Sequence, residues 1–287
     1  MANLKEIRNR ISSVSSTMQI TSAMKMVSAA KLKKAQDAIT AMRPYSNKLT
    51  ELLQSLSATL DADSGSKYSV QREVKNVLIV AITSNRGLAG AFNSNIIKEV
   101  NRLATETYAN QEVSYLAIGK KANDAFKKTN KVIANKSDLY DDLTFENVAE
   151  IAEMIMEKFV EGDYDKVELV YNSFKNAATQ IIMAEQFLPI VPIEGEDAHA
   201  NLDYIFEPSK QEIVETLIPK SLKTQLYKAI RDSFASEHGA RMTAMHKATD
   251  NATELRDQLK LTYNKARQAA ITNEILEIVG GAEALNN

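Results

Sequence analysis

The strongest constraint on the fold of this chain is an apolar repeat with a period of 3.5 residues at its beginning. From Leu4 to Leu60, side chains at alternating spacings of three and four form one seam, and 13 of its 17 positions are apolar. A period held that long is typical of a helix in a left-handed coiled coil. A continuous helix of this length would extend for about 85 Å. We therefore expect a long helix at residues 1–60, with a kink or brief interruption at Pro44.

Three consecutive seam positions are not apolar: Thr21, Lys25 and Ser28. They lie in the stretch 21–31, which is rich in small residues. Small side chains allow another backbone to approach closely, or leave a smooth surface past which a neighbour can slide. The alternative interpretation is an ordinary helix with few seam contacts and high alanine propensity.

The middle of the chain has a different pattern, in which short apolar runs alternate with helical stretches. Residues 61–75 are polar and read as a linker, and residues 76–195 predict a small α/β domain with a Rossmann-like sheet. We expect a helix to begin near Asn93 or Ser94, and another behind Thr144, because these residue types cap helices. The expected strands are 76–83, 112–118, 132–134, 166–173 and 180–192.

After a connection at residues 196–219, the segment 220–287 reads as a second long helix. We trace its seam through alanine, leucine and other small residues: Met245, Ala248, Ala252, Leu255, Leu259, Thr262, Ala266 and Ala269. Such a seam fits a close antiparallel partner, and the N-terminal helix of the same chain is the obvious one. The expected fold class is therefore α/β with long helices, namely an antiparallel two-helix coiled coil with an inserted sheet domain. Most of so long a shaft must be enclosed by other subunits, or it would expose apolar surface to water.

Composition excludes several classes of protein. The net charge is −2, but nine basic and two acidic side chains lie in residues 1–50, against four basic and 19 acidic ones in residues 137–215. The absence of cysteine excludes a disulfide scaffold, a thiolate metal site and a cysteine nucleophile. We also expect no membrane span, since no apolar run approaches the roughly 20 residues required, and no targeting peptide at the N-terminus.

Four stretches of the chain resemble the gamma subunit of F-type ATP synthases, in the order in which that family carries them. They are Ile7–Ile11 with Ile20–Val27, then Arg86–Asn93, then Tyr263–Gln268, and finally the specific C-terminal run from Ile271 to Ala284. The resemblance implies the rotor of a bacterial enzyme, with its terminal helices inside a ring of alpha and beta subunits. It places the α/β domain on the ring of membrane c subunits beside the epsilon subunit. It also implies a peripheral location on the cytoplasmic side of the bacterial plasma membrane, and membrane contact only through partners.

The same resemblance implies which residues contact partners, and no catalytic site, cofactor or metal of the chain's own. Met24 and Lys25 correspond to a contact with an acidic lever of a beta subunit, which also explains a lysine on the seam. Arg267 and Gln268 resemble a pair that hydrogen-bonds a loop of a beta subunit, and Glu274 and Glu277 would face the same inner surface. The full set of expected partner-contact residues is Met24, Lys25, Arg267, Gln268, Ile271, Thr272, Glu274, Glu277, Gly281 and Ala282.

Two alternatives remain open at this stage. Gly87 and Gly90 follow a strand and could cradle a phosphate, although the loop lacks the patterns of dinucleotide and phosphate loops. The basic N-terminal helix also fits a coiled-coil tether or a nucleic-acid-binding protein with a non-catalytic α/β domain. Asn85, Ala89 and Ala91 depart from the family pattern, so no role is assigned to that loop.

Overall fold

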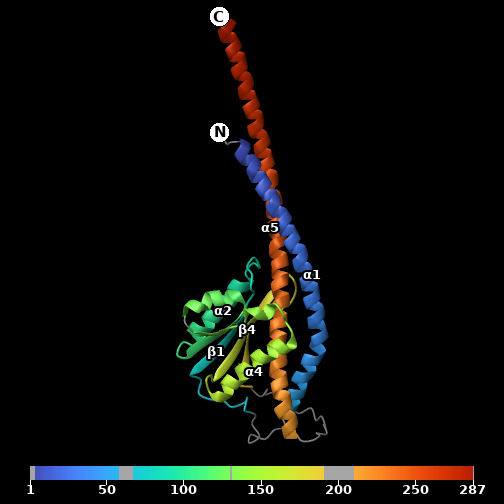
Figure 1. Ribbon diagram of the computed structural model, residues 1–287, viewed down its shortest axis with the longest axis vertical. Helices are drawn as coiled ribbons and strands as arrows, with labels where there is room; N and C mark the ends of the chain where they lie inside the picture. The colour runs from blue at the N-terminus through green and yellow to red at the C-terminus, as the bar shows by residue number, and fades with distance from the viewer. Residues whose placement is uncertain (1–3, 58–66, 130, 191–209, 287) are drawn as a thin grey trace. The chain divides into compact units, whose positions relative to one another are not determined.

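The computed structural model describes residues 4–57, 67–129, 131–190 and 210–286 (Figure 1). The chain divides into two compact units, one made of Met1–Ser28 with Met242–Asn287 and the other of Ala29–Arg241. Two long helices, α1 (Leu4–Ser57) and α5 (Lys210–Asn286), each contribute to both units. The expected class, long terminal helices with an inserted α/β sheet, is confirmed.

Helix α1 follows the predicted seam. Among the side chains of α1 that the structure describes, the buried ones all lie on that seam: Ile7, Thr21, Ser28, Leu32, Ala35, Ile39, Ser46 and Leu49. The remaining seam positions whose side chains are described, among them Lys25, are half-buried. The brief interruption expected at Pro44 is wrong, because α1 continues as one helix through that residue, and the alternative expectation of a kink stays a prediction.

In the first unit, α1 and α5 run antiparallel. The hydroxyls of Thr21 and Thr249 lie 2.8 Å apart, and the guanidinium of Arg8 donates to the Tyr263 hydroxyl at 2.8 Å. Between them, the Met18 sulfur accepts a hydrogen bond from Thr253 at 3.3 Å. Residue numbers therefore rise along one helix as they fall along the other.

The seam predicted for the C-terminal helix is correct only in part. Met245 and Ala252 are buried, but Leu255, Thr262 and Ala269 are exposed. From Ala252 onward the half-buried positions include two predicted seam residues, Leu259 and Ala266, together with Arg256 and Tyr263, which lie off that seam. Arg256 and Tyr263 hydrogen-bond to side chains of α1, so polar contacts add to the predicted seam in this part of the interface.

The second unit is built on a five-stranded sheet with the order β3-β2-β1-β4-β5. The first four strands are parallel to their neighbours, and β5 is antiparallel to β4 at the edge. The expected strands are all present, with bounds β1 Asn76–Ile82, β2 Glu112–Ile118, β3 Val132–Asn135, β4 Lys166–Phe174 and β5 Gln180–Leu188.

Helices cover both faces of this sheet. On one face, α2 (Phe92–Arg102) and α3 (Lys120–Phe126) pack against alternate residues of β1 and β2. On the other face, α4 (Phe145–Glu161) and residues 218–230 of α5 complete the larger apolar core. Short helical segments complete the unit: a π-helix at Leu103–Thr107 and 3-10 turns at Lys127–Thr129 and Ser137–Tyr140.

The helix starts test two of the predicted caps. Thr144 caps α4, since its hydroxyl accepts from the backbone amide of Asn147 at 3.3 Å. The cap expected at Asn93 or Ser94 is wrong, because α2 already begins at Phe92. The Asn93 side chain instead accepts a hydrogen bond from the Ser84 amide at 2.9 Å, and so anchors the loop after β1.

Helix α5 begins at Lys210, earlier than the expected start near residue 220, and continues through Pro219. Residues 196–209 of the expected connection, and 61–66 of the expected linker, lie outside the described residues. The division of the chain into domains at residues 60, 75, 195 and 219 stays a prediction.

Candidate partner-contact site

The last part of α5 extends beyond its pairing with α1. Arg8 meets Tyr263, and the first described residue of α1 is Leu4, so residues after about 267 have no described residue of α1 opposite them. Figure 1 shows this end of α5, in red, continuing past the start of α1. It carries large apolar side chains that are 48–71% exposed: Ile271, Ile275, Leu276, Ile278 and Val279. An apolar helix surface of this kind marks an interaction site.

Eight of the ten predicted contact residues lie on this extended segment, and the structure exposes every one of them to solvent: Arg267, Gln268, Ile271, Thr272, Glu274, Glu277, Gly281 and Ala282. Neither Glu274 nor Glu277 forms an ion pair with a described residue. A Cβ atom built on Gly281 would meet no described atom within 4 Å. The surface is therefore free for partners on all sides.

The other two predicted contact residues, Met24 and Lys25, lie on α1 and are half-buried. Lys25 has no ion pair among the described residues, although it occupies a seam position. Because Thr21 meets Thr249, this pair lies opposite α5 near residue 245, about 30 Å along the helix axis from Arg267. The predicted residues therefore form two separate groups within the first unit.

Sequence reasoning missed an exposed apolar patch next to Met24 and Lys25. Ile20, Met26 and Val27 are 59%, 65% and 58% exposed. The signal was present in the sequence, because all three are large apolar residues that fall off the seam of α1. Leu261, 65% exposed on α5, is a similar case.

The crevice in which open α/β sheets bind ligands is occupied here by the chain itself. The strand order reverses between β1 and β4, and ligands of such folds lie beyond the carboxyl ends of those strands. At this position the guanidinium of Arg241 donates to the carbonyls of Arg86 and Gly87, at 3.1 and 3.3 Å. A Cβ atom on Gly239 would lie only 3.1 Å from the Cα of Ala177 in the β4–β5 turn. This packing of α5 argues against the phosphate-binding alternative.

Buried charge accompanies that packing. The guanidinium of Arg241 donates to the carboxylate of Glu237 at 2.5 Å, and both side chains are about nine-tenths buried. Burial raises the pKa of Glu237, against the opposing effect of Arg241. Burial, together with Arg241 and Lys31, lowers the pKa of His238 to about 4, and neither ring nitrogen has a hydrogen-bond partner among the described residues. These groups are fixed by packing and do not line an open cleft.

Within the described residues, no three His, Asp or Glu side chains are grouped to hold a metal ion. No helix of the described chain is apolar enough over a sufficient length to cross a bilayer. The fold and the site thus define a class of protein: a two-helix hairpin with an inserted α/β domain and an exposed apolar helix end suited to binding partners.

Comparisons with known proteins identify the family. A family model described as ATP synthase matches residues 3–285. The ATP synthase gamma chain of Flavobacterium psychrophilum is 75% identical over 285 residues, covering 99% of each chain. That of Chlorobium phaeobacteroides is 49% identical over 292 residues, again covering 99% of each. The chain belongs to the ATP synthase gamma-chain family.

Solved structures agree on the fold. The central stalk and c-ring structure of Tetrahymena thermophila mitochondrial ATP synthase matches with a TM-score of 0.59 at 26% identity, covering 80% of this chain and 99% of that one. A structure of Euglena gracilis mitochondrial ATP synthase matches with a TM-score of 0.68 at 22% identity, covering 98% and 94%.

Proposed function

We propose that this chain is the central-stalk rotor subunit of a bacterial F-type ATP synthase. In this role it transmits rotation of the c ring, driven by proton flow, to the catalytic beta subunits, and so couples ATP synthesis or hydrolysis to proton transport. The proposal rests on one observation: the C-terminal end of α5 extends beyond α1 and exposes apolar side chains. Only surrounding partner subunits can cover these side chains. Membership of the gamma-chain family supports it.

The two groups of contact residues suit such a coupling. A rotor shifts the conformations of its neighbours only where it binds those conformations with different affinity. The shaft of the first unit is uneven, since an exposed patch at Ile20, Met26 and Val27 adjoins Lys25 on α1, while the end of α5 is a single helix. Each neighbouring subunit therefore meets a different surface as the shaft turns.

We assign the roles of the contact residues by their chemistry. Lys25, free of ion pairs within the described chain, is suited to an acidic partner, next to Met24. Arg267, exposed on α5, is suited to bidentate recognition of a carboxylate or a pair of carbonyls, with Gln268 beside it. Glu274 and Glu277 present carboxylates one turn apart, and the small tip at Gly281 and Ala282 leaves few specific contacts during rotation.

The same proposal covers what the chain does not do. It has no catalytic site of its own, contacts the alpha, beta, epsilon and c subunits, and meets the membrane only through them on the cytoplasmic side. The occupied crevice at Arg241 and Gly239 supports the absence of nucleotide binding by this subunit.

Co-purification is the direct test. A tagged chain expressed in its native cell should bring down an ATPase containing three copies each of two larger subunits. Recovery of the chain alone, or with nucleic acid that a higher salt concentration releases, would instead favour the tether or nucleic-acid alternative. Nucleotide affinity of the isolated chain should be negligible, and tight binding would contradict the non-catalytic role.

A further inference from the structure

The thioether of Met18, on α1, faces two hydrogen-bond donors of α5. The Thr253 hydroxyl lies 3.3 Å from the sulfur, and the guanidinium nitrogen Nη1 of Arg256 lies 3.5 Å from it. A thioether is only a weak acceptor of hydrogen bonds. The Thr253 hydroxyl has an alternative, since the carbonyl of Thr249 lies 2.9 Å away. For Nη1 of Arg256, the sulfur is the one acceptor within the described chain.

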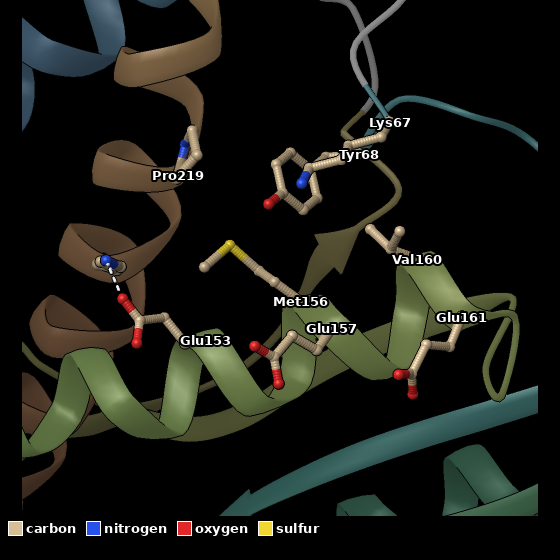
Figure 2. A pocket seen from close by; sticks show the side chains of 9 residues that line it. Lys67, Tyr68, Glu153, Met156, Glu157, Val160, Glu161 and Pro219 are labelled. Carbon is tan, nitrogen blue, oxygen red and sulfur yellow. Dashed lines mark hydrogen bonds and ion pairs between the residues drawn. The ribbon is translucent and has the colours of Figure 1, made fainter.

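The guanidinium of Arg256 is therefore paired with a strong acceptor on one edge only. Its Nε and Nη2 atoms lie 2.9 and 2.8 Å from the Asp257 carboxylate, while Nη1 meets the Met18 sulfur. The side chain of Arg256 is 23% exposed, so water covers little of it. Lys223, exposed to the same extent, has its ammonium group paired with Glu153, as the dashed line in Figure 2 marks. An oxygen atom on the Met18 sulfur would give Arg256 the acceptor that its second edge lacks.

Met18 is also accessible in part to a small oxidant. Its side chain is half-buried, whereas that of Met245 on α5 is only 4% exposed. With hydrogen peroxide, a lone pair of the sulfur attacks one peroxide oxygen, the O–O bond breaks, and hydroxide leaves and takes up the proton of the transferred oxygen as water. The sulfur loses two electrons and the peroxide gains them. The product is a sulfoxide, which is polar and which methionine sulfoxide reductases return to the thioether.

We propose that Met18 is a site of reversible oxidation by peroxide, and that Arg256 and Thr253 hold its sulfoxide oxygen so that oxidation tightens the pairing of α1 with α5. A hydrogen bond from a guanidinium is roughly twice as strong as a neutral one. The unbranched side chains of Met18 and Arg256 rotate to make room for the added oxygen. Oxidation of a packed methionine ordinarily disrupts its surroundings, so the effect at Met18 has the opposite sign. The inference does not depend on the rotor role.

Hydrogen exchange of the full chain after partial oxidation with hydrogen peroxide tests this inference. Mass spectrometry separates the oxidised and unoxidised copies of a peptide that contains Met18 and not Met24, so both are compared in one sample. The oxidised copy should exchange roughly tenfold more slowly, because opening of α1 then breaks an additional charge-assisted hydrogen bond. In Thr253→Val/Arg256→Ala the oxidised copy should exchange faster than the unoxidised one, since the sulfoxide oxygen has lost both donors.

Met26, on the same helix and 65% exposed, is the matched control, and its oxidation should change exchange of its own peptide less than about twofold. Met18→Gln supplies an amide oxygen without any oxidant, and Met18→Leu supplies none. The protection that Met18→Gln gains over Met18→Leu should fall roughly tenfold in the Thr253→Val/Arg256→Ala background.

Three results would overturn the proposal. They are a Met18 that stays unoxidised when Met26 is fully oxidised, an oxidised copy that exchanges as fast as the unoxidised one or faster, and a protective effect that persists in Thr253→Val/Arg256→Ala. The comparison of the two copies needs no variant, so it decides the matter even if the double variant does not fold.

Discussion

The hydroxyl groups of Thr21 on α1 and Thr249 on α5 lie 2.8 Å apart, where the α1 seam is not apolar. Thr21 is buried, and its hydroxyl also lies 3.1 Å from the carbonyl of Met18, while the Thr249 hydroxyl lies 2.8 Å from the carbonyl of Met245. Each hydroxyl has one proton, so one donates to the other while the second donates to the carbonyl of its own helix. The two hydroxyls meet in only one alignment of the two helices. Their contact therefore helps to set the register of the antiparallel pair, which packing of small residues alone would leave loosely specified.

Replacing either threonine should weaken the shaft measurably. Thr21→Val and Thr249→Val should each lower the free energy of unfolding by about 1 kcal/mol, because each leaves the opposing hydroxyl with one partner fewer. The double variant should lose less than the sum of the two, since both polar groups are then gone. Chemical denaturation of the four proteins measures this coupling. Thr262→Val, whose hydroxyl bonds only within its own helix, is the control, and strict additivity would remove the register role.

Removing Arg241 should be far more damaging than removing an exposed cation. Arg241→Ala leaves the buried carboxylate of Glu237 and two loop carbonyls without their donor, and should cost about 3–5 kcal/mol. Lys33→Ala removes a cation whose pair with Asp37 is largely exposed, so it should change stability by less than about 1 kcal/mol. Thermal unfolding of both variants makes the comparison, and equal shifts would show that the Arg241 contacts are not stabilising.

Stability should fall between pH 6.5 and 4 because of His238. Burial lowers the pKa of this imidazole to about 4 in the folded chain, whereas the unfolded value is near 6.5. Over that range the unfolded chain takes up a proton that the folded chain does not, so acidification favours unfolding by up to about 3 kcal/mol. Below pH 4 this contribution stays constant.

His238→Phe keeps an aromatic ring against Phe234 and should flatten the pH dependence between pH 6.5 and 4. Exposed His246, replaced by Gln, serves as the control and should leave the curve unchanged. Denaturation midpoints at half-unit pH intervals provide the measurement. A slope that persists in His238→Phe would assign the acid sensitivity to other groups.

Arg267→Ala should affect the working complex and not the fold of the chain. The side chain is exposed and holds no described structural contact, so thermal unfolding of the isolated chain should not change. In the assembled complex, loss of charge-assisted hydrogen bonds to a beta subunit should lower coupled turnover roughly tenfold. ATP-driven proton pumping measures this effect, with Lys260→Ala as an exposed cationic control on the same helix. Normal pumping by Arg267→Ala would remove this residue from the contact set.

Most of the fold was predictable because its elements carry strong local patterns. The seam from Leu4 to Leu49 matches the buried face of α1, since a 3.5-residue period can be satisfied in only one way by a paired helix. The strands of the sheet are short apolar runs between turn residues, and the structure has each of them in place. The four sequence motifs also indicated the correct family.

The candidate site was predictable in kind but not in arrangement. Lys25 and Arg267 could be named from motifs, yet only the pairing of Thr21 with Thr249 separates them by about 30 Å. The contribution of Arg256 and Tyr263 to the helix interface was missed. Their partners on α1 are distant in sequence, and a pattern within one helix does not report them.

The sequence by itself determined the local elements of this protein: two long helices, five strands and a basic-to-acidic change along the chain. Tertiary structure decided what closes the crevice at the end of β1, where the Asn93 side chain points, and which glutamate of α4, Glu153, pairs with Lys223. The physical reason is the range of the interactions. Apolar periodicity acts between residues a few positions apart, whereas the bonds of Arg241 to the loop after β1 join residues about 150 positions apart.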